Sequence, residues 1–284
     1  MRYLILGCNG MAGHTVSLYL KNKGHDVKGL ARKESVIVDT IVGDASDKGL
    51  LKKAILDVSY DVIVNCIGIL NRHAEEKKDQ AIYLNAYLPH YLESITTGTR
   101  TKVIHMSTDC VFSGKRGHYS EDDFKDGESF YDRSKALGEL ENSKDFTIRT
   151  SIIGPDLNPK GIGLLNWFMQ QSETVSGYKN VMWTGITTLQ LAKCIEKASE
   201  KQFTGLCNIV GQTPICKYDL LKLCNIYLRE EQISIVPNEM PILDKSLVTK
   251  RHLFSIPNYQ EMIVELAEWM RRNESLYPHY YKRK

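Results

Sequence analysis

The chain has 284 residues, of which 42% are hydrophobic and 25% charged, a composition typical of a folded globular protein rather than a disordered one. Its 37 basic and 34 acidic side chains leave a formal net charge of +3, too small to indicate a nucleic-acid-binding surface. Because the sequence contains neither an apolar run of about 20 residues nor a recognisable secretion signal, we expect a cytoplasmic protein that does not enter membranes.

The seven cysteines are irregularly spaced, and none of them forms a Cys-x-x-Cys pair. An odd number without regular spacing argues against a disulfide framework and against a zinc site. We therefore expect mostly buried, reduced thiols and no bound metal.

Short apolar segments alternate with helical patterns over the first half of the chain. This alternation predicts parallel βαβ units, and hence an α/β protein with a doubly wound (Rossmann) parallel sheet. Segments that are apolar on both faces suit strands that helices cover on each side. The strand candidates are residues 3–6, 26–30, 36–42, 61–67, 102–106 and 146–152, and the helix candidates are 11–23, 47–57, 74–97 and 131–142.

The pattern changes near Gly154, where glycine and proline crowd a loop. We predict a Rossmann domain over residues 1–153 and a smaller, mostly helical substrate-binding lobe over 154–284, some of whose strands can rejoin the core sheet. Helix candidates in the second half are residues 163–172, 186–200, 215–229 and 256–273, with strand candidates at 205–210 and 232–236.

A glycine-rich loop, GCNGMAG, connects the first strand to the first helix. Gly7 permits a tight turn, Gly10 lets the backbone approach a pyrophosphate, and Gly13 lets helix and strand pack closely. The amides at the helix N-terminus then attract negative phosphates. We predict a dinucleotide site to which Asn9 and Met11 also contribute. A tight turn without a ligand is the alternative.

The end of the second strand predicts which dinucleotide binds. NAD sites place an acidic residue there, whereas NADP sites use positive charge for the 2′-phosphate. Here the strand ends in Arg32 and Lys33, so we predict NADPH over NADH, with a solvated turn as the alternative. Asp44, followed by Ala45, is predicted to meet the adenine amino group, although a helix N-cap is equally compatible with the local sequence.

Four further stretches follow the glycine loop in order: VNCIG (64–68), MSTDCVFSG (106–114), YDRSK (131–135) and RTSIIGP (149–155). Together these motifs resemble the extended short-chain dehydrogenases/reductases over nearly the whole chain. Within that superfamily the chain is most similar to the dTDP-4-dehydrorhamnose reductase group, which reduces nucleotide-linked 4-keto-6-deoxy sugars. RTSIIGP lies where that family closes over the nicotinamide.

The resemblance implies the catalytic roles. Tyr131 would give a proton to the carbonyl oxygen, and Thr108 would hydrogen-bond the same oxygen. Lys135, one helical turn after the tyrosine, would lower its pKa by charge and hold the nicotinamide ribose. Hydride delivery to a ketone builds an alkoxide, so a proton donor is chemically required. Supporting residues would be Asn65 and Asn85, with Cys66, Ile67 and Gly68 lining the cofactor site.

Cys110 stands where sugar-nucleotide dehydratases carry a glutamate, which argues against 4,6-dehydration. It also resembles the cysteine of reductases that epimerise as well, such as GDP-fucose synthases and plant UDP-rhamnose synthases. There a thiolate removes a proton beside the ketone, and a second group returns one from the other face. Lys160 is our candidate for that second group. The alternative is that Cys110 only packs beside the sheet.

The second half of the chain supplies the candidate substrate contacts. Aromatic side chains could pack against base or sugar, threonines could donate hydrogen bonds, and an arginine could face the pyrophosphate, although each also suits a structural position. Nothing in these stretches distinguishes UDP from dTDP, or a 2-hydroxyl from a 2-acetamido sugar. The candidates are Asn166, Trp167, Trp183, Thr187 and Arg251.

Three functions remain open: an NADPH-dependent 4-keto sugar-nucleotide reductase, alone or coupled to C3 (or C3/C5) epimerisation; a sugar-nucleotide epimerase with a tightly held cofactor; and a non-enzymatic relative. Some relatives bind a metal at a dimer interface through a glutamate after the glycine loop. Here that stretch is His14-Thr15 without an acid, so we predict no metal and a surface position for His14. A homodimer is left open.

Overall fold

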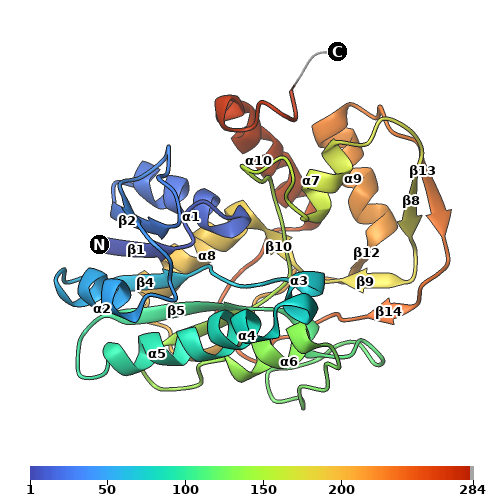
Figure 1. The fold of residues 1–284 in the computed structure, drawn as a ribbon. Coiled ribbons are helices and arrows are strands. Elements are labelled where there is room, and N and C mark those ends of the chain that lie inside the picture. The colour runs from blue at the N-terminus through green and yellow to red at the C-terminus, as the bar shows by residue number, and fades with distance from the viewer. Residues whose placement is uncertain (282–284) are drawn as a thin grey trace.

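Seven parallel strands form the main sheet of the computed structural model, which describes residues 1–281 (Figure 1). Their spatial order, β11-β6-β5-β4-β1-β2-β3, reverses direction between β1 and β4, where doubly wound folds bind ligands at the carboxyl ends of the strands. This arrangement confirms the predicted fold class. The strands are β1 (Arg2–Leu6), β2 (Asp26–Ala31), β3 (Thr40–Val42), β4 (Val62–Asn65), β5 (Lys102–Ser107), β6 (Phe146–Arg149) and β11 (Gly205–Asn208).

Helices cover both faces of the sheet. Successive side chains of a strand point to opposite faces, and here those on each face are apolar and buried. In β1, Tyr3 and Ile5 join one buried cluster, while Leu4 and Leu6 join another. Figure 1 shows α1 (Met11–Asn22), α8 (Thr188–Glu200) and α10 (Tyr259–Arg272) on one side. The other side carries α2 (Lys48–Leu56), α4 (Lys78–Ala81), α5 (Leu88–Ile95) and α6 (Phe130–Leu137).

The long helix expected over 74–97 is divided into several pieces. It begins as α3 (Asn71–Glu76), breaks at Lys77, whose φ of −127° and ψ of 64° are not helical, and resumes as α4. A π-helical segment, η1 (Ile82–Tyr87), then joins α4 to α5. Such segments are frequent at functional sites, and this one contains Asn85.

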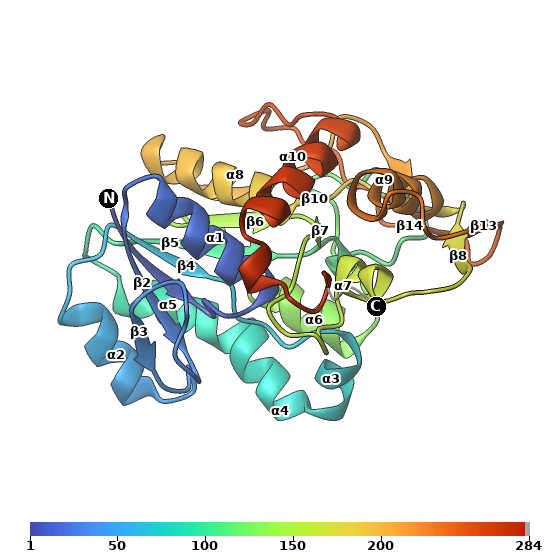
Figure 2. The same cartoon turned by 90° about the horizontal axis from the view of Figure 1, so that it is seen from above.

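The second half of the chain divides its elements between the main sheet and a lobe (Figure 2). Strand β11 joins the main sheet beside β6, while short strands form small separate sheets. These small sheets pair β7 (Ile152–Ile153) with β10 (Ile186–Thr187) and β8 (Val175–Tyr178) with β13 (Ile235–Asn238), and place β9 (Val181–Trp183) between β12 (Ile215–Cys216) and β14 (Leu243–Asp244). The same half of the chain also forms the helices α7 (Leu164–Met169) and α9 (Lys217–Arg229) and the 3-10 turn η3 (Glu274–Leu276).

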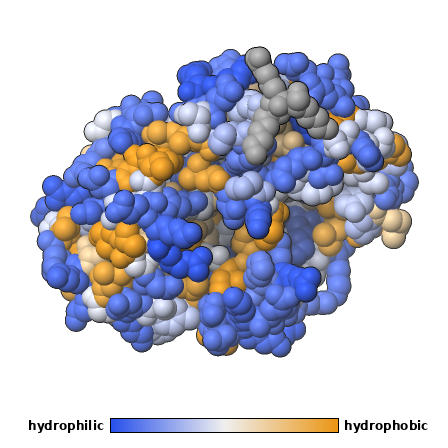
Figure 3. Space-filling model, turned by 45° about the horizontal axis from the view of Figure 1, so that its top comes forward, coloured by the Kyte–Doolittle hydropathy of each residue, from blue (hydrophilic) through white to orange (hydrophobic). Residues whose placement is uncertain are grey.

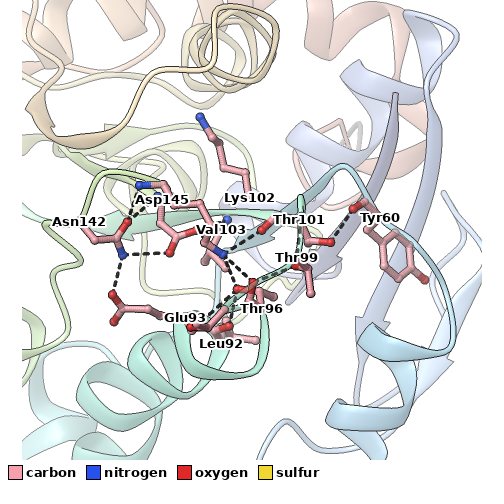
Figure 4. A network of polar contacts seen from close by, with 12 residues as sticks. Tyr60, Leu92, Glu93, Thr96, Thr99, Thr101, Lys102, Val103, Asn142 and Asp145 are labelled. Atoms are coloured by element: carbon pink, nitrogen blue, oxygen red, sulfur yellow. Dashed lines mark hydrogen bonds and ion pairs between the residues drawn. The ribbon is translucent and has the colours of Figure 1, made fainter.

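A polar network fastens β5 and β6 to α5 at the amino-terminal edge of the sheet (Figure 4). The Asp145 carboxylate accepts the backbone N–H of Val103 at 2.8 Å. Asn142 bridges this aspartate to Glu93 on α5, with Nδ2 2.9 Å from Asp145 and 2.6 Å from Glu93. The network leaves the opposite, carboxyl-terminal edge for the site. Within residues 1–281, no helix is long and apolar enough to cross a membrane.

Candidate active site

The glycine loop after β1 forms a tightly packed cradle. Gly7 has φ +79°, a left-handed conformation that favours glycine, and a Cβ there would come within 3.0 Å of Ile67. A Cβ on Gly13 would lie 2.1 Å from the Gly7 carbonyl oxygen, so only glycine fits. Gly10 is the N-cap of α1 and offers no side-chain acceptor to the first-turn amides. These uncapped amides, beside Cys66 and Ile67, suit a dinucleotide's phosphates.

The candidate ribose-binding residues gather beside this cradle. Asn9 donates from Nδ2 to the Lys33 carbonyl oxygen at 2.9 Å, which ties the glycine loop to the turn after β2. Arg32 is exposed there and lies close to Asp44. Hydrogen bonds from Ser46, helped by Arg32, hold the pKa of Asp44 below its ordinary value.

The alternative that Asp44 caps a helix is wrong. The N-cap of α2 is Asp47, whose side chain accepts the backbone N–H of Leu50. Asp44 instead closes a local turn by accepting the Ser46 N–H at 2.8 Å. Ala45 is buried in the cluster beneath this turn.

The loop that follows β7 lies over the glycine loop, with the Met11 sulfur against Gly163. Asn166, a predicted substrate contact, has its side-chain hydrogen bonds within the protein. It is fully buried, its Nδ2 donates to three carbonyl oxygens of loop 158–161, and its Oδ1 accepts from Tyr280 at 2.7 Å. Asn166 therefore holds the loop itself.

The Tyr131–Lys135 pair stands at the start of α6. A capping box between Ser129 and Asp132 begins the helix, which places Tyr131 in its first turn and Lys135 one turn later. Both side chains are buried, Tyr131 at 7% exposed and Lys135 at 4%. The sequence motif thus becomes a fixed pair at the carboxyl edge of β5.

Thr108 directly follows β5 and meets Tyr131. Its Oγ1 accepts the Cys110 N–H at 3.2 Å and lies 3.1 Å from Asp109 Oδ1, to which it donates. A hydrogen bond between the Thr108 and Tyr131 side chains opposes the effect of burial on the tyrosine. The structure therefore brings Thr108, Tyr131 and Lys135 together at one edge of the sheet.

Burial raises the pKa of Tyr131 above its ordinary value, and the nearby Cys110 thiol raises it further. The expected lowering by Lys135 does not prevail. The lysine Nζ donates to the Met106 carbonyl oxygen at 2.5 Å and lies 3.4 Å from His105 Nε2, so it is directed toward β5. The phenol consequently keeps its proton at neutral pH.

Lys135 has a buried partner that the sequence analysis did not identify. His105 lies between Lys135 and Asn65, whose Nδ2 is 3.1 Å from His105 Nδ1. Burial lowers the pKa of Lys135 to about 8 and that of His105 well below its usual value. A histidine inside an otherwise apolar strand, two residues before the Ser-Thr motif, was the available signal.

Asn85 joins the loop after β4 to α6. Its Oδ1 accepts the Ile69 N–H at 2.8 Å, and its Nδ2 donates to the Ser134 hydroxyl at 3.0 Å. A Cβ on Gly68 would lie 3.2 Å from Asn85 Oδ1 and 4.0 Å from Lys135 Nζ. Gly68 thus lies next to the candidate catalytic lysine, close to where the resemblance places the cofactor.

The candidate epimerisation pair is not brought together. Cys110 adjoins the site, but burial raises the pKa of its thiol to about 12. Lys160 is exposed on the loop after β7, whereas the charged groups near the thiol include Asp109, Lys245 and Asp132.

Two other candidate substrate residues have structural contacts instead. Thr187 is 2% exposed, and its hydroxyl caps α8 by accepting the Gln190 N–H at 3.1 Å. Arg251 donates from Nη1 to the carbonyl oxygens of Thr204 and Leu206, at the amino-terminal end of β11. Arg251 therefore lies at the opposite edge of the sheet from the candidate catalytic residues.

The two candidate tryptophans differ in exposure. Trp167 on α7 is 41% exposed, whereas Trp183 is 3% exposed and lies under the Lys217 ammonium, 4.8 Å from its ring centroid. Lys217 also interacts electrostatically with Asp109, the residue after Thr108. Trp183 and the Thr108 turn thus share Lys217 as a neighbour. In the orientation of Figure 3 the molecule is hollowed near its centre, where both apolar and polar atoms are exposed.

His14 is a correction to the sequence analysis. It is fully buried rather than on the surface, because Tyr277 from the C-terminal segment covers it, with Oη 2.9 Å from His14 Nε2. Burial lowers its pKa to about 4. Across the described part of the chain, no group of three or more His, Cys, Asp or Glu side chains could hold a metal ion, and all seven cysteines are free.

Similar folds occur among solved sugar-nucleotide enzymes. A dTDP-4-dehydrorhamnose reductase from Bacillus anthracis, solved with NADP, superposes with a TM-score of 0.80 at 20% identity, covering 93% of this chain and 98% of that one. A hypothetical dTDP-4-dehydrorhamnose reductase from Sulfolobus tokodaii superposes with a TM-score of 0.74 at 24% identity, covering 90% and 98%.

Sequence relatives match the first half of the chain. The Bacillus subtilis spore coat polysaccharide biosynthesis protein SpsK is 30% identical over 156 residues, which are 53% of this chain and 52% of SpsK. The dTDP-4-dehydrorhamnose reductase of Mycolicibacterium smegmatis is 28% identical over 141 residues, 49% of this chain and 40% of that protein. The matches thus span about half the length of these curated relatives. The family model described as RmlD substrate binding domain matches residues 1–155, and the chain belongs to that family.

Proposed function

We propose that this protein catalyses the NADPH-dependent reduction of the C4 ketone of a nucleotide-activated 4-keto-6-deoxyhexose. The observation that carries the proposal is the placement of Thr108, Tyr131 and Lys135 at one edge of the sheet, beside the glycine cradle. The B. anthracis neighbour, solved with NADP, supports the cofactor, and relatives named dTDP-4-dehydrorhamnose reductase support the substrate class.

The residues present fit a dinucleotide phosphate. Gly7, Gly10 and Gly13 keep the start of α1 free of side chains, while Arg32 and Lys33 supply positive charge for a 2′-phosphate. NADPH, when bound, supplies the hydride that reduces the carbonyl carbon. In our proposal residues 1–153 bind this cofactor and residues 154–284 bind the sugar nucleotide.

The protein side chains manage the proton. Thr108 hydrogen-bonds the carbonyl oxygen, and Tyr131 protonates that oxygen as negative charge develops on it. Lys135 adds positive charge from the same helix face and holds the ribose. Water is kept from the donor because Tyr131 is almost fully buried.

The protonated phenol of Tyr131 suits the proton-donating step of reduction, which a cofactor-retaining epimerase also needs in the second half of its cycle. Reduction requires a protonated phenol, whereas the first half of an epimerase cycle, oxidation of an alcohol, requires a phenolate base. Burial raises the Tyr131 pKa and so favours the phenol. An epimerase neighbour exists, a Methanobrevibacter ruminantium UDP-N-acetylglucosamine 4-epimerase at 15% identity, which makes this distinction relevant.

Coupled epimerisation at C3 or C5 is the finer question. It would need Cys110 to act as a base, and a thiol pKa near 12 disfavours the thiolate at neutral pH. We therefore propose reduction without epimerisation. Incorporation of solvent deuterium at C3 or C5 that is lost in Cys110→Ser would contradict this.

The function is tested by following NADPH absorbance with a UDP- or dTDP-4-keto-6-deoxyhexose made in place by a dehydratase. We expect stoichiometric NADPH oxidation that disappears in Tyr131→Phe. Absence of oxidation with either nucleotide, despite measurable cofactor binding, would overturn the proposal.

A further inference from the structure

Lys217 is half-buried, and no described residue forms an ion pair with its positive charge. It is the first residue of α9, and within residues 1–281 its ammonium makes neither a hydrogen bond nor an ion pair. An ammonium has three donors, and where no protein acceptor meets them a ligand can. Desolvation by the surrounding protein lowers the Lys217 pKa to about 8. Such a group is suited to receive an acceptor from a ligand.

The surroundings of Lys217 place that ligand at the catalytic edge. The ammonium lies 4.8 Å above the ring centroid of buried Trp183, so one of its sides is closed. It is also near enough to Asp109 and Cys110 to interact electrostatically with both, without an ion pair to Asp109. Lys217 belongs to the lobe, whereas Asp109 and Cys110 directly follow Thr108.

A molecule that receives a proton near Thr108 therefore comes close to Lys217. Strand β14 runs beside the loop after the catalytic turn, since the Asp244 N–H donates to the Gly114 carbonyl oxygen at 2.9 Å. Strand β9 pairs with β14 on one side and with β12 on the other. Helix α9, which begins at Lys217, follows β12 directly. The position of Lys217 relative to the catalytic turn is thus built into the lobe.

We propose that Lys217 donates a hydrogen bond to an oxygen-bearing substituent of the reacting sugar, and so helps to determine which nucleotide sugars the protein accepts. This inference rests on the proposed function, because it takes the bound molecule to be a nucleotide sugar. The nucleotide diphosphate is the other source of acceptor oxygens, and the experiment separates the two.

The test is calorimetric binding of dTDP and UDP, and of the unreactive sugars dTDP-glucose and UDP-glucose, to wild type and Lys217→Met in the presence of NADP. We expect the variant to bind the better nucleotide sugar about 10- to 100-fold more weakly, as for loss of a hydrogen bond from a charged donor. Binding of the corresponding free nucleoside diphosphate should change less than about 2-fold on the same grounds. Lys217→Arg should lose less than Lys217→Met.

Three outcomes would overturn the proposal: unchanged sugar binding, equal weakening of sugar and free diphosphate, or no sugar binding by the wild type. A thermal melt separates binding from structure, because removal of an unneutralised ammonium should leave Tm equal or higher. A lower Tm together with unchanged binding would assign Lys217 a purely structural contact with Trp183. Failure of the reductase assay in wild type overturns the proposed function alone, since these titrations need no turnover.

The matched control lies on the same helix. Lys222 places its ammonium 5.2 Å from the Tyr218 ring centroid, but it is exposed. Lys222→Met removes the same charge and the same kind of ring contact from α9. Nucleotide-sugar binding by Lys222→Met should equal that of the wild type.

Discussion

Lys135 and His105 face each other at the carboxyl end of β5, with the lysine Nζ 3.4 Å from the imidazole Nε2. The tautomer of His105 follows from its other neighbour. Asn65 accepts the Ile67 N–H with Oδ1, so its Nδ2 donates to His105 Nδ1, and the hydrogen of the neutral imidazole is on Nε2. Burial is what lowers the pKa of the neighbouring Lys135 ammonium.

This relationship predicts a basic limit to activity. In the proposed mechanism Lys135 acts as a cation, and its folded pKa of about 8 lies below the ordinary 10.5. Activity should therefore be full below pH 8 and fall about tenfold per pH unit above it, as a single deprotonation requires. The measurement is kcat at saturating substrate from pH 6 to 10. Saturation matters because Lys217, whose pKa is also about 8, affects binding.

Lys135→Arg provides the control for that profile. A guanidinium stays charged throughout this range, so the variant should lose the basic limb while working at a lower, constant kcat. A limb that persists unchanged in Lys135→Arg would show that another group titrates.

Tyr131→Phe should lower kcat by about 10²- to 10⁴-fold, the usual contribution of a positioned acid. The phenyl ring fills the same buried space, so NADPH affinity and Tm should stay close to wild type. The measurements are NADPH oxidation, fluorescence titration of NADPH, and a thermal melt. Activity within fivefold of wild type would assign proton donation to another group.

Gly13→Ala should abolish NADPH binding, because its Cβ would lie 2.1 Å from the Gly7 carbonyl oxygen and must displace the loop. Gly49→Ala is the matched control. Gly49 lies inside α2, where its Cβ would meet only Asp47 Oδ1, at 3.3 Å, and alanine favours helix by up to about 1 kcal/mol. NADPH titration of both variants decides the matter, and tight binding by Gly13→Ala would contradict the cradle.

Some of this site was predictable because its determinants are local in sequence. Gly10 and Gly13 are packed against Gly7 and Cys8 of the same loop, and Tyr131 and Lys135 share one capped helix. Spacing alone places such residues. The order of the motifs along the chain then implied the parallel sheet that brings them to one edge.

The remainder depended on contacts between distant segments. From the sequence, Arg251 and Thr187 are candidate substrate contacts. In the structure Arg251 donates to a backbone carbonyl oxygen next to β11, and Thr187 caps α8. Lys217 showed no local signal, because its importance comes from Asp109, more than 100 residues earlier. Strands as short as β9 and β12 contain too few residues for an alternation of apolar and polar side chains to be recognised in the sequence.

The buried pair Arg149–Glu139 lies beside the carboxyl end of β5 and is joined to it through Ser107. Arg149 contacts Glu139 with two nitrogens, at 2.7 and 2.8 Å, and both side chains are fully buried. Ser107, adjacent to Thr108, donates to the same carboxylate at 2.6 Å. Glu139→Gln should reduce the free energy of unfolding by about 3 kcal/mol, because it leaves a buried guanidinium without its counter-charge.

Urea denaturation measures this loss, and the exposed pair Arg272–Glu268 on α10 is its control. Glu268→Gln should change the free energy of unfolding by no more than about 0.5 kcal/mol, since exposed i,i+4 pairs contribute little. Equal effects at the two sites would mean that burial does not set the strength of the Arg149 pair.

Arg32 and Lys33 predict cofactor preference. Both are exposed at the end of β2, and Asn9 holds their turn beside the glycine loop. Arg32→Ala with Lys33→Ala should weaken NADPH binding by about tenfold or more, as loss of hydrogen bonds between charged groups implies, while NADH binding stays unchanged. Lys52→Ala with Lys53→Ala, two exposed lysines on α2, controls for the loss of two positive charges. Equal weakening of NADPH and NADH would show that these side chains hold the turn rather than read the 2′-phosphate, and an unchanged NADPH affinity would move that recognition elsewhere.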